Sequence, residues 1–262
     1  MAYPPIPLDG FERREELLKS VYRYMDEQFP VMFYRTNDFV HSQRVLWHLE
    51  SILPMAEQVY GSKFDVGLAR MIALVHDDVE MNVGEDPVGD VQLYVKERMS
   101  PEERREMDRR EGKVIQELSK MFPTLINGFH YGSLLFAAKE KLGLEAQLVS
   151  YCDKFDGFGE ALHEVFAGNR YFIRPATTYP SRLRDFRKLY PKLRLLLGIE
   201  HPMFRIEDID FKAVAEEGSL HTQDSIRVYS KYSPYEVWKA NIMYKGGLKA
   251  LTEQKERLQR SA

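Results

Sequence analysis

The sequence predicts an all-α protein, and three observations lead to that fold class. Apolar residues recur at steps of three and four along most of the 262 residues, which is the period of a one-sided helix. No segment shows a convincing alternation of apolar and polar residues, the pattern of a half-buried strand. Two serine–proline pairs, beginning at Ser100 and Ser233, carry the signature of a helix start.

The first two helices follow directly from this period. Residues Phe11–Phe29 form the first predicted helix, because apolar side chains such as Leu18 and Val21 recur along one side. The second predicted helix covers Asp38–Tyr60. We expect Pro54 to kink or end it, since proline lacks a backbone N–H and clashes with the preceding turn.

The rest of the chain continues the helical pattern. The third predicted helix, Asp65–Val79, is more apolar than its neighbours, which predicts a central position. A further helix begins after Ser100, because Pro101 follows and Glu103 completes a capping box. The remaining predicted helices are Gly132–Lys141, Glu145–Gly168, Ser181–Leu197 and Ser233–Arg260. Gly, Pro and Asn residues predict loops at Gly84–Asp90, Pro123–Gly128 and Arg174–Pro180.

Composition excludes several classes of protein. With 37 Lys and Arg against 40 Asp and Glu, the net charge is −3, which argues against a nucleic acid polymer as partner. Cys152 is the single cysteine, which excludes an intramolecular disulfide and a Cys-based zinc site. The segment Met1–Pro7 does not resemble a signal peptide, and no stretch approaches the ~18 apolar residues of a membrane span. We therefore expect a soluble cytoplasmic protein without a membrane partner.

Histidine and aspartate carry the predicted chemistry. His76 and Asp77 stand at the end of an apolar helix, where the backbone leaves helical geometry and two adjacent side chains can converge on one ion. His41 lies on the preceding predicted helix, and Asp153 lies on a later one among apolar neighbours. An aspartate in such surroundings loses hydration unless it is paired or metal-bound. Two imidazoles and two carboxylates suit a divalent metal such as Mn, Co, Fe, Ni or Mg.

These residues resemble the HD-domain metal-dependent phosphohydrolases. The similarity rests on their order along the chain and on three short segments, Phe39–Ser42, His76–Glu80 and Cys152–Lys154. Within that superfamily the chain is most similar to the branch of bacterial nucleoside 5′-monophosphatases. The resemblance implies an HD-domain helical bundle with metal ligands at His41, His76, Asp77 and Asp153. It implies cleavage of a phosphate monoester, most simply of a nucleotide, by attack of a metal-bound water.

The same resemblance suggests roles for further residues. Glu80 would act as an acid or base on the attacking water. An acidic residue in the loop after Gly84 would assist catalysis, and of the two candidates, Glu85 and Asp86, we favour Asp86. Arg35, upstream of the first histidine, would contact the phosphate or the sugar of the substrate. Lys154 is a substrate-binding candidate because it adjoins Asp153 and could neutralise phosphate charge.

The sequence also predicts two regions in the chain and leaves two alternative functions open. Residues 1–198 would form the helical hydrolase domain, and residues 199–262 a C-terminal helical extension that covers the pocket or builds a homodimer. We expect one divalent metal ion, with His130 and His163 as candidate ligands for a second. A dinuclear oxygenase or lyase on the same scaffold is one alternative function, and a catalytically weak nucleotide-binding regulatory protein is the other.

Overall fold

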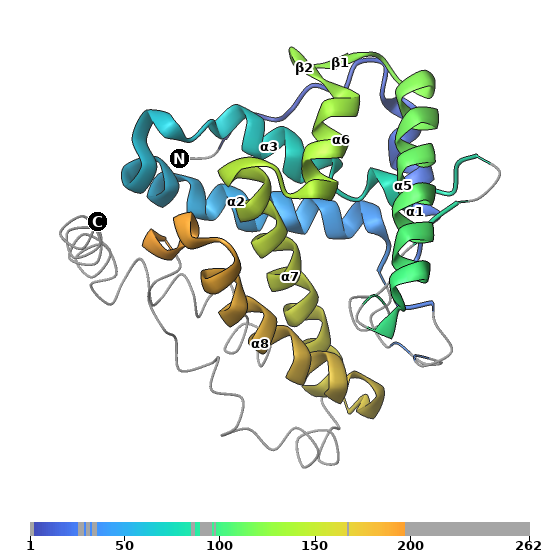
Figure 1. Ribbon diagram of the computed structural model, residues 1–262, viewed down its shortest axis with the longest axis vertical. Coiled ribbons are helices and arrows are strands. Elements are labelled where there is room, and N and C mark those ends of the chain that lie inside the picture. The colour runs from blue at the N-terminus through green and yellow to red at the C-terminus, as the bar shows by residue number, and fades with distance from the viewer. Residues whose placement is uncertain are drawn as a thin grey trace. The chain divides into compact units, whose positions relative to one another are not determined.

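The structure is a computed structural model that describes residues 3–25, 29, 32, 36–84, 87–89, 96, 98–166 and 168–196 (Figure 1). Its longer helices are α1 (Glu12–Lys19), α2 (Asp38–Tyr60), α3 (Val66–Val75), α5 (Pro101–Met121), α6 (Tyr131–Glu140), α7 (Gly143–Phe166) and α8 (Ile173–Leu189). In this part of the chain, strands are limited to the pair β1 (Leu125–Ile126) and β2 (Phe129–His130). The predicted all-α class is therefore confirmed. None of the described helices is long and apolar enough to cross a membrane.

The chain divides into two compact units that interleave in sequence. The first unit comprises Met1–Asp26, Arg35–Glu50 and Asp65–Val149, and the second comprises Glu27–Tyr34, Ser51–Phe64 and Ser150–Ala262. The division falls within α2 and α7, so each of these helices contributes residues to both units. The predicted domain boundary after residue 198 lies outside the described residues and stays a prediction.

Helix α1 is shorter than the sequence predicts. It ends at Lys19, so the predicted continuation through the next residues is wrong. Tyr22 instead forms an isolated β-bridge with Asn37, and the backbone N–H of Arg23 donates to the carbonyl of Thr36 at 3.0 Å. These long-range backbone hydrogen bonds replace the helical ones, and they hold the segment after α1 against the beginning of α2.

Helix α2 has the predicted bounds, and of the two predicted effects of its proline, the end of the helix is wrong. Pro54 lies inside the helix and does not end it. The residues on both sides of Pro54, including Leu53 and Met55, are buried. Burial of this apolar stripe outweighs the single backbone hydrogen bond that proline removes.

The core of the first unit lies around α3, as its apolar sequence predicts. All residues from Met71 to Val75 are buried there. Helix α6 packs beside both α3 and α5 (Figure 1). The predicted capping box at the start of α5 is confirmed, since Ser100 Oγ accepts from the N–H of Glu103 and Glu103 Oε2 accepts from the N–H of Ser100.

The loop predicted at Pro123–Gly128 contains a tight hairpin. Leu125 pairs with His130 and Ile126 with Phe129, in an antiparallel register. Asn127 and Gly128 form the turn with φ values of 48° and 85°. Both residue types adopt positive φ readily, which is what a two-residue hairpin turn requires.

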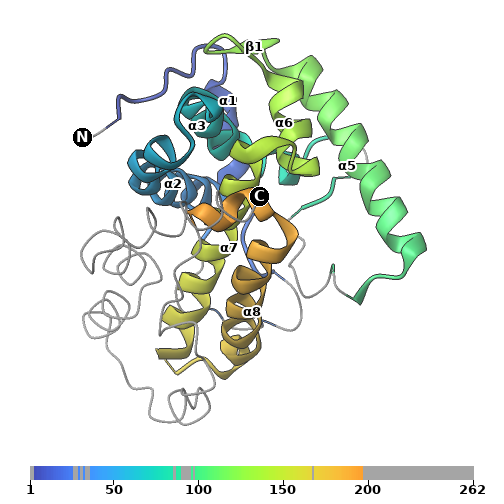
Figure 2. The ribbon, with the colours of Figure 1, turned by 60° about the vertical axis from the view of Figure 1, so that its left-hand side comes forward.

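In the second unit, α8 runs alongside α7 (Figure 2). Tyr151 on α7 contacts Phe186 on α8 with ring centroids 5.7 Å apart. Helix α8 begins at Ile173, so the loop predicted at Arg174–Pro180 is wrong. Buried Ala176, Tyr179 and Leu183 follow helical spacing, and this stripe outweighs the helix-breaking effect of the prolines.

Candidate metal centre

The first turn of α2 places His41. Asn37 caps this helix, because its Oδ1 accepts from the N–H of Val40 at 3.0 Å and its carbonyl accepts from the N–H of His41 at 3.0 Å. The side chain of His41 is completely buried. The imidazole is therefore held at the beginning of a long helix and inside the protein.

The end of α3 places His76 and Asp77 on the same side. His76 is the last residue with helical dihedrals, at φ −60° and ψ −31°, whereas Asp77 has left the helix at φ −100° and ψ 7°. A short 3₁₀ helix, Asp78–Glu80, follows at once. This change of backbone geometry lets two adjacent side chains converge, as the sequence predicts for a helix end.

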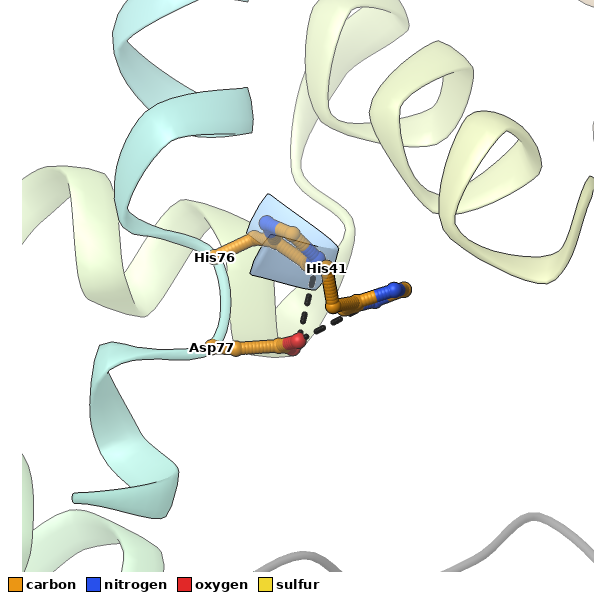
Figure 3. A group of neighbouring side chains, drawn as sticks. All are labelled: His41, His76 and Asp77. Atoms are coloured by element: carbon orange, nitrogen blue, oxygen red, sulfur yellow. Dashed lines mark ion pairs between the residues drawn. The ribbon is translucent and has the colours of Figure 1, made fainter. Parts of the chain in front are cut away.

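The three side chains meet at one carboxylate oxygen (Figure 3). Asp77 Oδ2 lies 3.2 Å from Nε2 of His41 and 3.3 Å from Nε2 of His76. The two imidazole centroids are 5.4 Å apart. One nitrogen or oxygen atom from each residue lies within 4.8 Å of the others, a spacing at which all three could bind one ion.

A hydrogen bond on the far side of the His76 ring sets its tautomer. His76 Nδ1 lies 2.8 Å from the carbonyl oxygen of Ala73. A carbonyl can only accept, so Nδ1 carries a proton and donates it to this carbonyl, and Nε2 is the ring nitrogen that faces Asp77. Metal-binding histidines are commonly oriented in this way by a carbonyl or a carboxylate.

Two properties of this cluster favour a bound cation: the lowered pKa of Asp77 and the buried polar atoms that lack a hydrogen bond to any described residue. Burial by itself would raise the pKa of Asp77, but positive charge on His76 and His41 lowers it well below its usual range. His76 Nε2 and Asp77 Oδ2 are buried, and within the described part of the chain neither makes a hydrogen bond. Leaving such atoms unsatisfied is costly, and a divalent cation would satisfy both. The nitrogen and oxygen donors also match the divalent metals expected from the sequence.

Two further carboxylates lie beside Asp77. Oxygen atoms of Asp38, Asp77 and Glu80 fall within 4.8 Å of one another. Glu80 is thus close to the cluster, where the sequence predicts an acid or base. Asp38 is completely buried and was missed by the sequence reasoning. Its position three residues before His41, on the same face of a helix, is the signal that points to it.

An arginine that the sequence reasoning missed also reaches the cluster. Arg23 Nη1 lies 3.9 Å from Asp77 Oδ2 and 3.7 Å from Asp38 Oδ1, and its side chain is only 6% exposed. The β-bridge between Tyr22 and Asn37 brings this segment to the beginning of α2. The sequence offered no signal for Arg23, because its predicted helix would have continued past this point.

Four other predicted site residues belong to the second unit or lie outside the described residues. Asp153 and Lys154 are on α7, in the second unit, where they form an ion pair with each other. Their metal-binding and substrate-binding roles stay predictions. Arg35 and Asp86 lie outside the described residues.

Helix α7 also carries buried acids that the sequence reasoning missed. Asp156 and Glu160 are 0% and 6% exposed, one helical turn apart. Their four-residue spacing within an apolar stretch is the sequence signal that would have identified them.

Of the two candidate ligands for a second metal, His130 lies in the first unit, and the structure does not support this role for it. His130 is an exposed residue at the beginning of α6, where its Nδ1 accepts from the N–H of Ser133 at 3.4 Å. It belongs to none of the potential metal-binding groups among the described residues. His163 lies on α7, in the second unit.

Comparisons with known proteins place the chain in a family. A family model described as 5′-deoxynucleotidase YfbR-like matches residues 18–197. Among solved structures, the chain is similar to an HD-domain phosphohydrolase from Listeria innocua, with a TM-score of 0.54 and 20% sequence identity. That likeness covers 84% of this chain and 96% of the other, and it supports the fold. No curated protein matches the chain. The chain has a fold like that of an HD-domain phosphohydrolase. It belongs to the YfbR-like 5′-deoxynucleotidase family, and it is a hydrolase of phosphate monoesters.

Proposed function

We propose that the protein hydrolyses the phosphate monoester of a nucleotide, with one divalent cation held by His41, His76 and Asp77. Asp153 is the fourth ligand in this proposal. The observation that carries it is the convergence of two imidazole nitrogens on Asp77 Oδ2 in a buried site. When bound there, the cation would supply the positive charge that acidifies a water molecule and offsets the charge of the phosphate.

The chain's own residues would perform the remaining steps. The Ala73 carbonyl keeps the His76 ring in one tautomer and one orientation. Glu80 would take the proton of the attacking water and then pass a proton to the leaving alcohol oxygen, and its carboxylate within 4.8 Å of those of Asp77 and Asp38 supports this role. Asp86 is proposed to assist this transfer.

Arg23 extends the proposal to substrate binding. A phosphate monoester carries close to two negative charges, and an arginine guanidinium binds it through several parallel hydrogen bonds. Arg23 is a buried cation less than 4 Å from the carboxylates of the cluster. It could exchange part of these contacts for phosphate oxygens. Arg35 and Lys154 remain proposed phosphate or sugar contacts.

The choice of a nucleotide rests on the family. The matching model describes 5′-deoxynucleotidases, and it covers most of the chain. We therefore propose nucleoside 5′-monophosphates, with or without the 2′-hydroxyl, as the substrate class. The cytoplasm is the proposed location, and a homodimer the proposed assembly.

A phosphate-release assay tests this function. The protein would be stripped with a chelator, loaded with Mn²⁺, Co²⁺ or Mg²⁺ in turn, and supplied with nucleoside 5′-monophosphates or with sugar phosphates. We expect metal-dependent release from the nucleotides and little from the sugar phosphates. His76→Ala should abolish release, whereas His130→Ala, which changes an exposed histidine outside the cluster, should retain it. Equal activity in the chelated and metal-loaded proteins would contradict the proposal.

Metal content separates this function from the two alternatives. Elemental analysis should give one metal per chain. Two tightly bound iron ions, with no phosphate release, would favour the dinuclear oxygenase or lyase. Nucleotide binding without turnover under any of the three metals would favour the regulatory protein.

A further inference from the structure

A second buried cluster lies directly beside the proposed metal ligands. Asp78, the residue after Asp77, is completely buried, and both of its oxygens are bound. Arg14 Nε donates to Oδ1 at 2.9 Å and to Oδ2 at 2.8 Å, and Arg14 Nη2 lies 2.7 Å from Oδ1. The hydroxyl of Tyr131 donates to Oδ2 at 2.8 Å. We call Arg14, Asp78 and Tyr131 the anchor.

The anchor brackets His76 and Asp77 on both sides. Arg14 Nη2 also donates to the carbonyl oxygen of Leu74, in the last turn of α3. Carbonyl groups at a helix end lack partners within the helix and need them from elsewhere. One guanidinium therefore holds the backbone just before the two ligands and the side chain just after them.

Aromatic packing makes the anchor rigid. The ring of Tyr131 meets Phe11 edge-on at 5.0 Å and Phe122 at 5.7 Å, and Phe11 stacks on Phe122 at 5.1 Å. All of these rings are buried. Burial and the adjacent Asp78 carboxylate raise the pKa of Tyr131 well above its usual value, so its hydroxyl stays protonated and remains a donor.

Stability alone does not explain a buried ion pair of this kind. Removing an arginine and an aspartate from water costs several kcal/mol, and apolar side chains of similar volume often stabilise a protein as well or better. What the charged pair adds is direction, because a two-pronged guanidinium–carboxylate contact allows one orientation of each partner.

From this geometry we propose that Arg14, Asp78 and Tyr131 are positioning residues, which hold the turn His76–Glu80 in the shape that the cation and the proton transfer require. The proposal rests on the function proposed above.

A triple variant separates positioning from stability. Arg14→Met, Asp78→Leu and Tyr131→Phe together remove every polar group of the anchor and keep its volume apolar, so the fold should persist. We expect Mn²⁺ affinity, followed by electron paramagnetic resonance, to fall about 10–100-fold, the usual loss when groups that support metal ligands are removed. The control is Arg70→Met with Glu50→Leu, which replaces the ion pair between α2 and α3 and should leave Mn²⁺ affinity unchanged.

Amide hydrogen exchange of the metal-free protein gives a readout that is independent of metal and of turnover. The N–H groups of Glu80 and Met81 donate to the carbonyls of Asp77 and Asp78 at 2.9 and 3.1 Å. They should exchange slowly in the wild type and at least about tenfold faster in the triple variant. Unchanged exchange and unchanged Mn²⁺ affinity in a folded triple variant would overturn the proposal.

Two further outcomes are also decisive. If the triple variant does not fold, Tyr131→Phe alone, which removes one hydroxyl, replaces it, with the same expected directions and about a tenfold loss of Mn²⁺ affinity. If the wild type binds none of Mn²⁺, Co²⁺ and Mg²⁺, the proposed function fails, and hydrogen exchange alone then tests the anchor.

Discussion

Asp77 and Asp78 are adjacent, and both side chains are buried, yet their surroundings are opposite. Asp77 Oδ2 faces the nitrogens of His41 and His76 at 3.2 and 3.3 Å and makes no hydrogen bond within the described residues. The Asp78 oxygens accept from Arg14 and Tyr131. Asp77 is 9% exposed and Asp78 is completely buried, so the larger difference between them lies in their partners. A buried carboxylate with unmet bonding capacity indicates a ligand site, whereas a fully bonded one indicates a scaffold.

Asp77→Asn should produce the largest effect. The amide keeps the size of the side chain and removes the charge that the proposed cation needs. We expect no retained metal and loss of phosphate release far beyond the roughly 10–100-fold cost of losing a supporting residue. Elemental analysis and the phosphate-release assay measure both. Wild-type metal content in this variant would remove Asp77 from the proposed ligand set.

Glu80→Gln should have the next largest effect, and only on turnover. Its role in the proposal is to accept a proton, which typically contributes about 10²–10⁴-fold to the rate. We expect kcat to fall by that factor while metal content stays at the wild-type level. Contrasted with Asp77→Asn, this variant separates proton transfer from metal binding. Simultaneous loss of the metal would instead make Glu80 a ligand.

Arg14→Ala should mainly lower the free energy of unfolding, because it removes the partner of Asp78 and not a proposed metal ligand. It leaves the Asp78 charge buried without its cation, and breaking such a pair costs about 3–5 kcal/mol. We expect urea unfolding of the metal-free protein to show that loss. The matched variant is Arg105→Ala, whose ion pair with Glu102 is about three-quarters exposed and should contribute less than about 1 kcal/mol. Equal losses of unfolding free energy in the two variants would contradict the conclusion that Asp78 depends on a buried ion pair with Arg14.

Tyr131→Phe should give the smallest change in stability. It removes one hydrogen bond to a carboxylate that still accepts from Arg14, so we expect a loss of about 1.5–3 kcal/mol. Thermal or urea unfolding measures this loss. A loss as large as that of Arg14→Ala would indicate that Tyr131, and not the arginine, is the main partner of Asp78.

Much of the fold could be predicted from local sequence patterns. The bounds of α2, the capping box at Ser100 and the apolar α3 all depend on residues close together in the chain. The incorrect predictions lie where distant contacts outweigh local preference. Helix α1 stops at Lys19 because the next segment bonds to residues 36–38, and α8 begins early because its buried stripe outweighs its prolines.

The sequence by itself determined the fold class, the resemblance to HD-domain phosphohydrolases and the adjacency of His76 and Asp77 at a helix end. These follow from periodicity and from residue order, which are local properties of the chain. Only the tertiary structure decided that Arg23 and Asp38 lie beside Asp77, and that Arg14 and Tyr131 bind Asp78. Those contacts join residues up to 64 positions apart, and no local pattern encodes which distant side chain fills a buried space.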